Sequence, residues 1–373
     1  MNTKFDDIRP YVDTEIPDAM QRIANHPALP LLASYVFPEK PLEEVKALLL
    51  SFRSINDFQH GVMHRVNEQI INKSITEFSY GGLEHLKQGT PYLFVSNHRD
   101  IMLDASLLQN VLADNGLETS QITFGANLMM HDLVIDIGKS NKMFRVERPG
   151  GSIKDFYNRL LHLSEYIRYV ICEKKESVWI AQRNGRTKDG NDKTDQGVIK
   201  MFSMSETKDN VASIANLNIV PVAVSYEWES CDLLKAIELY ESLNVKYMKK
   251  PGEDLNSILT GILQPKGRVH FQCCEPIHTE ELTPFADCVS TEYHRQVAQL
   301  IDERILAAYK LWPTNYIAHD MLSGSRQYSD HYTEAEYKAF EEHMKPLEQY
   351  ECNQSVLRNI FLHIYANPVN NKI

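Results

Sequence analysis

The stretch PYLFVSNHRDIMLDASLL, residues 91–108, changes its hydrophobic pattern part-way along. Residues 92–96 are a continuous, mostly apolar run, which is typical of a strand buried on both faces. From Ile101 onward the apolar residues fall at helical spacing, at positions 103, 107, 108 and 111. A buried strand followed at once by a helix indicates an α/β fold, in which functional side chains follow the carboxyl ends of parallel strands.

The same alternation continues along the middle of the chain. Further strands are predicted at 121–125, 142–146, 177–181, 218–226 and 267–274, and helices at 155–172 and 292–311. Strands that alternate with helices are joined by crossover connections, which favour parallel pairing. We therefore predict an α/β fold with a mixed, mostly parallel sheet flanked by helices.

The two ends of the chain have helical patterns. Residues 1 to about 85 are predicted to be helical, with an acidic first turn at 41–44 followed by an apolar stripe. Beyond Trp312 and Pro313 the helical pattern returns, to about residue 365. We predict an N-terminal helical region (1–80), an α/β domain (81–312) and a C-terminal helical extension (313–373).

The composition is that of a globular protein and excludes several classes. Of 373 residues, 43% are hydrophobic and 24% charged. Lys and Arg number 39 against 50 acidic residues, a net charge of -11, so nucleic acid is not an expected partner. A polyanionic substrate would need a local cluster of cations. The six cysteines form no C-x-x-C pair and are predicted to be free thiols in a reducing cytoplasm.

Neither a signal peptide nor a membrane-spanning segment is predicted. The acidic N-terminus has no apolar core of the length that secretion requires, and no apolar stretch approaches about 20 residues. We expect a cytoplasmic protein that could also bind peripherally to the inner face of the membrane.

His98 is the first candidate for chemistry, because it follows the predicted strand at 92–96. Asp104 lies six residues later, near the first helical turn, where its carboxylate can turn back toward the imidazole. A histidine oriented by a carboxylate is suited to remove a proton from an alcohol. The spacing alone also fits a structural histidine and a helix-start aspartate.

The histidines allow two other interpretations. The run His98-Arg99-Asp100 resembles a protein-kinase catalytic loop, but position 105 is alanine where that loop has asparagine, and no Gly-rich loop or D-F-G is present. A metal-dependent phosphohydrolase could use His60, His64 and the pair at 131–132 as ligands. His60 and His64 share one helix face in that interpretation.

Two segments concentrate positive charge in this acidic chain. Residues 138–154 hold five basic side chains against a single Glu147, beside two glycines. Residues 178–192 run from a strand into a turn-rich loop with three basic side chains. Guanidinium groups bind phosphate bidentately, so both segments are candidate phosphate sites, although a solvated loop and a surface hairpin fit the same patterns. The basic residues are Lys139, Lys142, Arg145, Arg148 and Lys154 in the first segment, and Arg183, Arg186 and Lys188 in the second.

A fourth segment, NIVPVAVSYE at 218–227, has a proline inside a strand that otherwise looks central. Because proline cannot donate to a ladder, Pro221 is predicted to lie near an edge or a pocket.

Together these four segments resemble the four sequence blocks of the glycerolipid acyltransferase family, which includes glycerol-3-phosphate and 1-acylglycerol-3-phosphate acyltransferases. SNHRDIMLD resembles the block N-H-x-x-x-x-D, and FRVER resembles F-x-x-R. AQRNGRTKDG resembles a block that usually has E-G-x-R-S, and IVPVAVSYE resembles V-P-V-x-I. The resemblance covers about residues 81–277.

Two departures from the family pattern are evident. Five residues separate His98 from Asp104, where the family has four, so either the turn bulges or Asp100 is the partner of His98. Asn184 stands where a glutamate is usual, which keeps a hydrogen-bond acceptor and loses a charge. These departures leave open a different lipid alcohol or amine as acceptor, or a catalytically altered lipid-binding relative.

The resemblance implies a mechanism. His98, held by Asp104, would remove the proton from a glycerol hydroxyl as that oxygen attacks an acyl thioester, and backbone N–H groups near the helix start would stabilise the oxyanion. Neither a metal nor a cofactor is implied. The donor would be acyl-CoA or an acyl carrier protein, and the acceptor glycerol-3-phosphate or lysophosphatidate, in phospholipid synthesis. Helices near the N-terminus and residues 337–365 are candidate membrane contacts.

The resemblance also assigns the remaining site residues. Arg148 and Arg186 would hold the acceptor phosphate, supported by Arg145, Lys142 and Lys188. The substrate loops would contain Asn97, Arg99, Asn184, Gly185 and Pro221.

Overall fold

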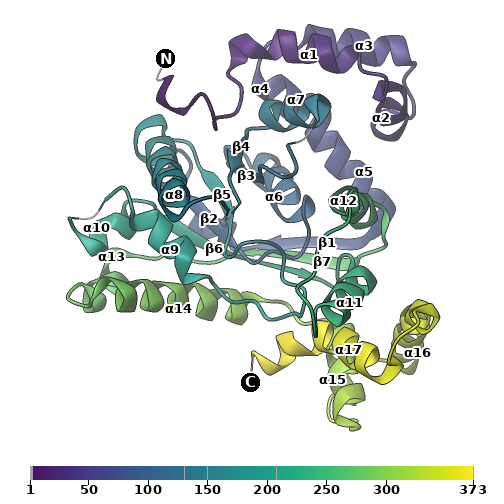
Figure 1. Cartoon of the computed structure of the whole chain (residues 1–373). Helices are drawn as coiled ribbons and strands as arrows, with labels where there is room; N and C mark the ends of the chain where they lie inside the picture. The colour runs from purple at the N-terminus through teal and green to yellow at the C-terminus, as the bar shows by residue number, and fades with distance from the viewer. Residues whose placement is uncertain (1–2, 130, 149, 207, 373) are drawn as a thin grey trace.

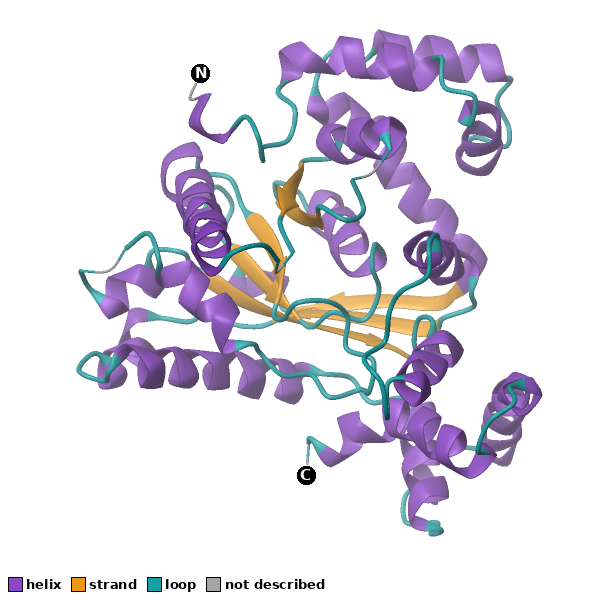
Figure 2. Ribbon diagram, viewed as in Figure 1, coloured by secondary structure: helices purple, strands orange, loops and turns teal. Residues whose placement is uncertain are grey.

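The computed structural model describes residues 3–129, 131–148, 150–206 and 208–372, so residues 1–2 and 373 of the predicted end regions lie outside it. A seven-stranded sheet crosses the middle of the molecule, with helices on both of its faces (Figures 1 and 2). Its order is β1-β7-β6-β2-β5-β3-β4. The strands are β1 (Ile75–Gly81), β2 (Leu93–Ser96), β3 (Gln121–Gly125), β4 (Met143–Val146), β5 (Val178–Ala181), β6 (Ile219–Tyr226) and β7 (Gly267–Cys273).

Strand direction divides the sheet in two. Strands β6, β2, β5, β3 and β4 pair in parallel. Strand β7 is antiparallel to β6, and β1 is parallel to β7. The predicted α/β fold with a mixed, mostly parallel sheet is therefore confirmed. The carboxyl ends of these five parallel strands, β6, β2, β5, β3 and β4, lie along one side of the sheet.

The helices account for most of the remaining chain. The first group is α1 (Ile16–Ala24), α2 (Leu29–Val36), α3 (Leu42–Ser51), α4 (Ile55–Phe58), α5 (His64–Ser74), α6 (Leu103–Asp114), α7 (Asp132–Ser140) and α8 (Ile153–Arg168). The second group is α9 (Gln196–Ser203), α10 (Asn210–Ala215), α11 (Asp232–Glu241), α12 (Glu253–Leu263), α13 (Thr279–Leu282), α14 (Ser290–Ala308), α15 (Pro313–Ser323), α16 (Glu334–Met344) and α17 (Gln354–Asn370).

Alternate residues of β2 enter two different cores, as a strand buried on both faces requires. Leu93 and Val95 join a core built with side chains of α8, α9 and α14. Phe94 joins a second core, which includes Leu107 of α6. All four residues of β2 are buried, so this strand is covered on both faces of the sheet. The chain that carries His98 begins where β2 ends.

The prediction of helix throughout the N-terminal region is wrong for residues 75–81. Residues 75–81 were expected to continue the N-terminal helices, but they form β1, which pairs only with β7. The sequence ITEFSYG has β-branched and aromatic residues, and an edge strand exposed along much of its length lacks the strong apolar signal of a buried one. Helix α5 ends at Ser74, directly before it.

The two predicted end regions are helical apart from β1. Helices α1–α4 share a core with the π-helical turn at Gln59–Met63, and α15–α17 share another core with α11. Whether these regions are separate units stays a prediction. All six cysteines are free thiols.

Candidate active site

His98 lies two residues beyond β2, on the side of the sheet where five parallel strands end. Its Nδ1 lies 2.9 Å from Oδ2 of Asp104. A carboxylate can only accept, so the ring proton is on Nδ1 and Nε2 carries a free lone pair. Within the described residues Nε2 has no hydrogen-bond partner, and the side chain is 14% exposed. The ring contacts Trp179 edge-on, at 5.8 Å between centroids.

Asp104 is fully buried and accepts hydrogen bonds on both carboxylate oxygens. Besides His98, Oδ2 accepts from the backbone N–H groups of Arg99 at 2.6 Å and Asp100 at 2.9 Å. Oδ1 accepts from the hydroxyl of Tyr226 at 2.8 Å. Of the two partners that the sequence left open for His98, the structure pairs the ring with Asp104.

The extra residue in the first block is accommodated by a turn that Asp100 stabilises. Asp100 Oδ1 accepts from the backbone N–H groups of Met102 at 2.8 Å and Leu103 at 2.9 Å, which caps the start of α6. Its Oδ2 accepts from the hydroxyl of Ser230. With Asp104 holding the N–H groups of Arg99 and Asp100, four backbone donors near the helix start are occupied. The expectation that donors here bind an oxyanion is therefore wrong for these four.

Tyr226, the last residue of β6, was not predicted as a site residue. Burial and the negative charge of Asp104 raise the pKa of its phenol well above 10. The phenol therefore remains a donor to Asp104 at any pH at which an enzyme works. The signal that could have found it is the polar ending Ser-Tyr-Glu after an apolar strand, because β6 lies next to β2 in the sheet.

Arg148 joins the loops that follow three adjacent strands. Its Nε donates to Oδ1 of Asn127 at 2.9 Å, and its Nη1 donates to Oδ1 of Asn184 at 3.1 Å. Asn127 follows β3, Arg148 follows β4 and Asn184 follows β5. Asn184, which replaces the usual glutamate, thus serves as a neutral acceptor for this guanidinium, and Arg148 itself is exposed.

Arg186 lies between Gly185 and Thr187, which place it near the other site groups. A Cβ on Gly185 would lie 3.9 Å from Nη1 of Arg148, and the N–H of Thr187 donates to the carbonyl of His98 at 2.7 Å. The side chain of Arg186 lines a cavity of about 350 Å³ together with residues of α11, α12 and the chain between them. Its Nη1 is buried and has no hydrogen-bond partner within the described residues.

Comparison with known proteins identifies the domain that carries these groups. Residues 77–225 match the family model described as Acyltransferase. This part of the chain is an acyltransferase-family domain. No curated protein matches the chain. Among solved structures, the 1-acyl-sn-glycerophosphate (LPA) acyltransferase PlsC from Thermotoga maritima is similar at 12% identity and a TM-score of 0.37, over 79% of this chain and 96% of that one.

Three of the residues predicted to bind phosphate either lie far from His98 or already form ion pairs with carboxylates. Lys142 lies at the amino end of β4, whereas His98 follows the carboxyl end of β2. Because the two strands run in the same direction, the residues lie at opposite ends of the strands. Its Nζ donates to Thr119, and burial lowers its pKa. The prediction that Lys142 supports a phosphate beside His98 is wrong. Arg145 pairs with Glu147 at 2.7 Å, and Lys188 pairs with Glu238.

Asn97 and Arg99 are buried structural residues rather than open loop residues. Asn97 exchanges two hydrogen bonds with the backbone of Val224, extending the pairing of β2 with β6 beyond the ladder. Arg99 pairs with Asp192 and Glu229, and each of these three side chains is at most 3% exposed. Their placement as substrate contacts is therefore wrong; both fix the turn that carries His98.

The partners of Arg99 were missed because they lie 93 and 130 residues away along the chain. Lys235 of α11 completes the cluster by donating to Glu229 at 2.6 Å and to the carbonyl of Arg99 at 2.7 Å. Two cations face two carboxylates, so the charges balance in a buried setting, where an unpaired charge would be strongly destabilising.

Contrary to the prediction of an edge position, Pro221 lies inside the sheet. It is buried in β6, one of the inner strands, opposite Val95 of β2. The antiparallel ladder with β7 begins only at the next residue, Val222, which pairs with Cys273. The missing N–H of Pro221 therefore falls just outside that ladder, and no described pairing is interrupted.

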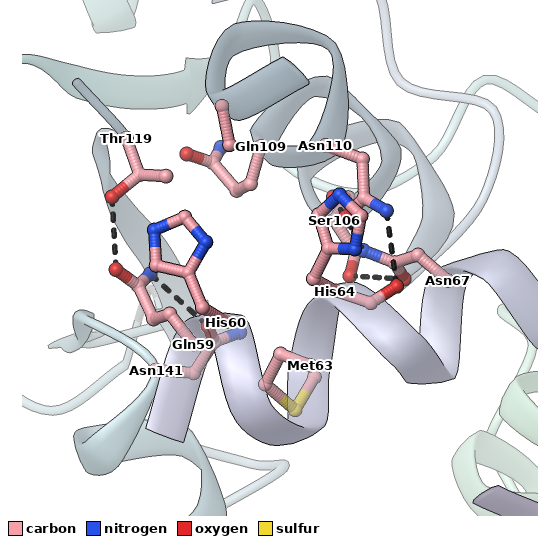
Figure 3. Close-up of a pocket in the computed structure, with 11 residues that line it drawn as sticks. Gln59, His60, Met63, His64, Asn67, Ser106, Gln109, Asn110, Thr119 and Asn141 are labelled. Carbon is pink, nitrogen blue, oxygen red and sulfur yellow. Dashed lines mark hydrogen bonds between the residues drawn. The ribbon is translucent and has the colours of Figure 1, made fainter. Parts of the chain in front are cut away.

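His60 and His64, two of the proposed metal ligands, line a separate polar pocket that does not include His131 or Asp132 (Figure 3). His60 and His64 lie on one face of the helical segment, and His64 Nε2 is 2.6 Å from Asp114. Gln59 bonds to Thr119 and Asn141 beside them. The cavity is about 10 Å³, room for roughly one water. Within the described ranges no group of three or more His, Cys, Asp or Glu is placed to hold a metal ion.

Proposed function

We propose that the acyltransferase domain moves a fatty acyl group from an acyl thioester to a glycerol-phosphate acceptor, glycerol-3-phosphate or lysophosphatidate, in phospholipid synthesis. The observation that carries the proposal is the His98–Asp104 pair, with Nε2 uncommitted, at the edge of the sheet where the loops bearing Arg148 and Arg186 meet. The family match supports acyl transfer in general. The choice of acceptor rests on the two arginines.

In the proposed reaction Nε2 of His98 accepts the proton of the acceptor hydroxyl as its oxygen attacks the thioester carbonyl. The new C–O bond forms, the C–S bond breaks, and the proton passes from His98 to the departing thiolate. Asp104 holds the Nδ1–H and stabilises the imidazolium that forms between these steps. General-base assistance of this kind contributes about 10²–10⁴-fold to a rate.

The acceptor phosphate would be bound by the two arginines. Arg148 is exposed, donates with two of its guanidinium nitrogens to neutral amides, and forms no ion pair within the described residues, although its charge helps to lower the pKa of the nearby Asp254. Arg186 has a buried nitrogen without a partner. Guanidinium groups with unused N–H donors favour a dianionic phosphate, because they bind it through charge-assisted hydrogen bonds.

The test is transfer of a labelled acyl group by the purified chain. Acyl-CoA and acyl carrier protein are offered as donors, each with glycerol-3-phosphate and with lysophosphatidate as acceptors. A phosphate-dependent ester product from at least one combination is the expected result, and the productive combination identifies the branch. Transfer only to an acceptor without a phosphate, or no transfer to any acceptor, would overturn the proposal.

A further inference from the structure

Helix α12 and the chain before it expose a set of large apolar side chains. Leu255, Leu259 and Leu263 recur every four residues, so they share one face of the helix, and they are 57%, 49% and 64% exposed. The preceding segment adds Leu243, Val245 and Met248, which are 56–82% exposed. Single exposed apolar residues are ordinary, but six of them are concentrated within residues 243–263, and such a concentration indicates an interaction site.

The opposite face of α12 packs on the catalytic turn. Ser257 and Gly261, four residues apart, are buried. A side chain on Gly261 would overlap the carboxylate of Asp100, which caps the helix after His98. The helix therefore presents small residues inward and leucines outward, with the active site close behind it.

The charges on this surface are unevenly compensated. Glu253 accepts from the Tyr247 hydroxyl and the backbone of Lys250, while Asp254 pairs with Lys249. Within the described residues the side chains of Lys246 and Lys250 have no acidic partner, and both residues are exposed. The segment that leads into α12 thus carries two cationic groups that are free to meet anionic ones, whereas the charged residues of α12 itself, Glu253 and Asp254, are acidic and already accept hydrogen bonds.

The same surface is connected to the predicted phosphate residues. Asp254 accepts from Asn127 at 2.8 Å, and Asn127 in turn accepts from Arg148. Tyr247, Lys250 and Asn256 line the cavity of about 350 Å³ that Arg186 also lines. A lipid that left a bilayer at α12 would meet this cavity and the arginines next.

We propose that residues 243–263 dock on the surface of an anionic phospholipid bilayer and admit a lipid acceptor to the cavity beside Arg186. Exposed leucines on one face of a helix insert into a membrane interface, and the lysines of the segment before α12 add attraction to anionic lipids. No described helix is long and apolar enough to cross a membrane. The docking is inferred from the exposed leucines and lysines of residues 243–263 alone, whereas the admission of a lipid acceptor rests on the proposed function.

Sedimentation of the full chain with vesicles tests the docking. The vesicles contain phosphatidylcholine alone or with about a quarter phosphatidylglycerol. We expect stronger binding to the anionic vesicles, and a loss of about tenfold or more in the double variant Leu255→Gln/Leu259→Gln, because both leucines lose their apolar contact with lipid. The control is Val289→Gln, a residue 75% exposed at the start of α14. Equal vesicle binding by the double variant and the wild type would overturn the proposal.

Activity measurements separate this proposal from the proposed function. The double variant should keep its transfer rate to soluble glycerol-3-phosphate and lose rate on lysophosphatidate presented in vesicles. Leucine-dependent vesicle binding by a wild type that transfers to no acceptor would leave the docking intact and overturn only the function. If the double variant instead loses binding to acyl carrier protein and retains vesicle binding, the partner is a protein and the docking proposal is wrong.

Discussion

The hydroxyl of Tyr226 donates to Oδ1 of Asp104 at 2.8 Å, on the carboxylate oxygen that His98 does not use. Tyr226 ends β6 and His98 follows β2, and these two strands are neighbours in the sheet. The carboxylate is therefore held from both strands at once, and the imidazole is oriented by the sheet as well as by its own turn.

Replacement of His98 by alanine should abolish most acyl transfer while the chain stays folded. The side chain is partly exposed and makes one hydrogen bond, so its loss removes the base without leaving a large cavity. We expect a fall in kcat/KM of at least about 10²-fold. His60→Ala is the matched control, since His60 lines the separate polar pocket. Undiminished turnover in His98→Ala would end the mechanism.

Tyr226→Phe should lower kcat and leave the acceptor KM unchanged. The variant leaves one oxygen of a buried carboxylate without its donor, and a hydrogen bond to a charged group is worth about 1.5–3 kcal/mol. A misoriented imidazole then slows transfer by about tenfold or more. Because the pKa of Tyr226 is raised well above 10 by burial and by Asp104, the pH-rate profile between about pH 7 and 9 should keep its shape. Loss of stability with an unchanged kcat would make the tyrosine structural only.

Arg148→Gln should raise the KM for the acceptor much more than the KM for the thioester. Arg148 joins three loops at the site edge and has no acidic partner within the described residues. Arg145→Gln is the matched control from the same block, because Arg145 is paired with Glu147. Steady-state kinetics with each substrate varied in turn make the comparison. Similar effects of both variants on the acceptor KM would contradict the assignment of the phosphate to Arg148.

The sequence was informative where the chemistry is local. His98 and Asp104 are six residues apart, so a turn alone brings them together, and the apolar run at 92–96 defined the strand before them. The concentration of basic residues was a poor guide to their position. Lys142 and Arg148 belong to one segment, but Lys142 precedes β4 and Arg148 follows it, so they lie at opposite ends of that strand. Tyr226 is 122 residues from Asp104, and only the strand order brings it there.

His343 should make the stability of the protein depend on pH. Burial lowers the pKa of this imidazole, but the hydrogen bond and charge of Asp232, at 2.6 Å, outweigh that effect and raise it above 6.5. The folded state then binds the proton more tightly than the unfolded chain. The stabilisation is fully present below about pH 6.5 and is lost as the pH rises through the folded pKa. The difference in Tm between the wild type and His343→Gln should therefore be larger at pH 5.5 than at about pH 8.5. A difference that grows toward alkaline pH would contradict this assignment.

Gly190→Ala should displace the loop that follows β5, because the added Cβ would overlap α17 of the C-terminal extension. Gly190 has φ +79°, and a Cβ there would overlap the carbonyl oxygen of Ile364 in α17, while Asn367 of α17 donates to the carbonyl of Asp189 at 2.7 Å. Gly89→Ala is the matched control: its φ is +76°, and nothing lies within 4 Å of the added Cβ. Both variants carry the left-handed strain of about 1–2 kcal/mol, so a larger fall in Tm and kcat for Gly190→Ala measures the contact with α17. Because the carbonyl of Gly190 also accepts from Arg99 at 3.4 Å, a displaced loop should weaken the turn that carries His98. Equal falls in the two variants would show that α17 does not position this loop.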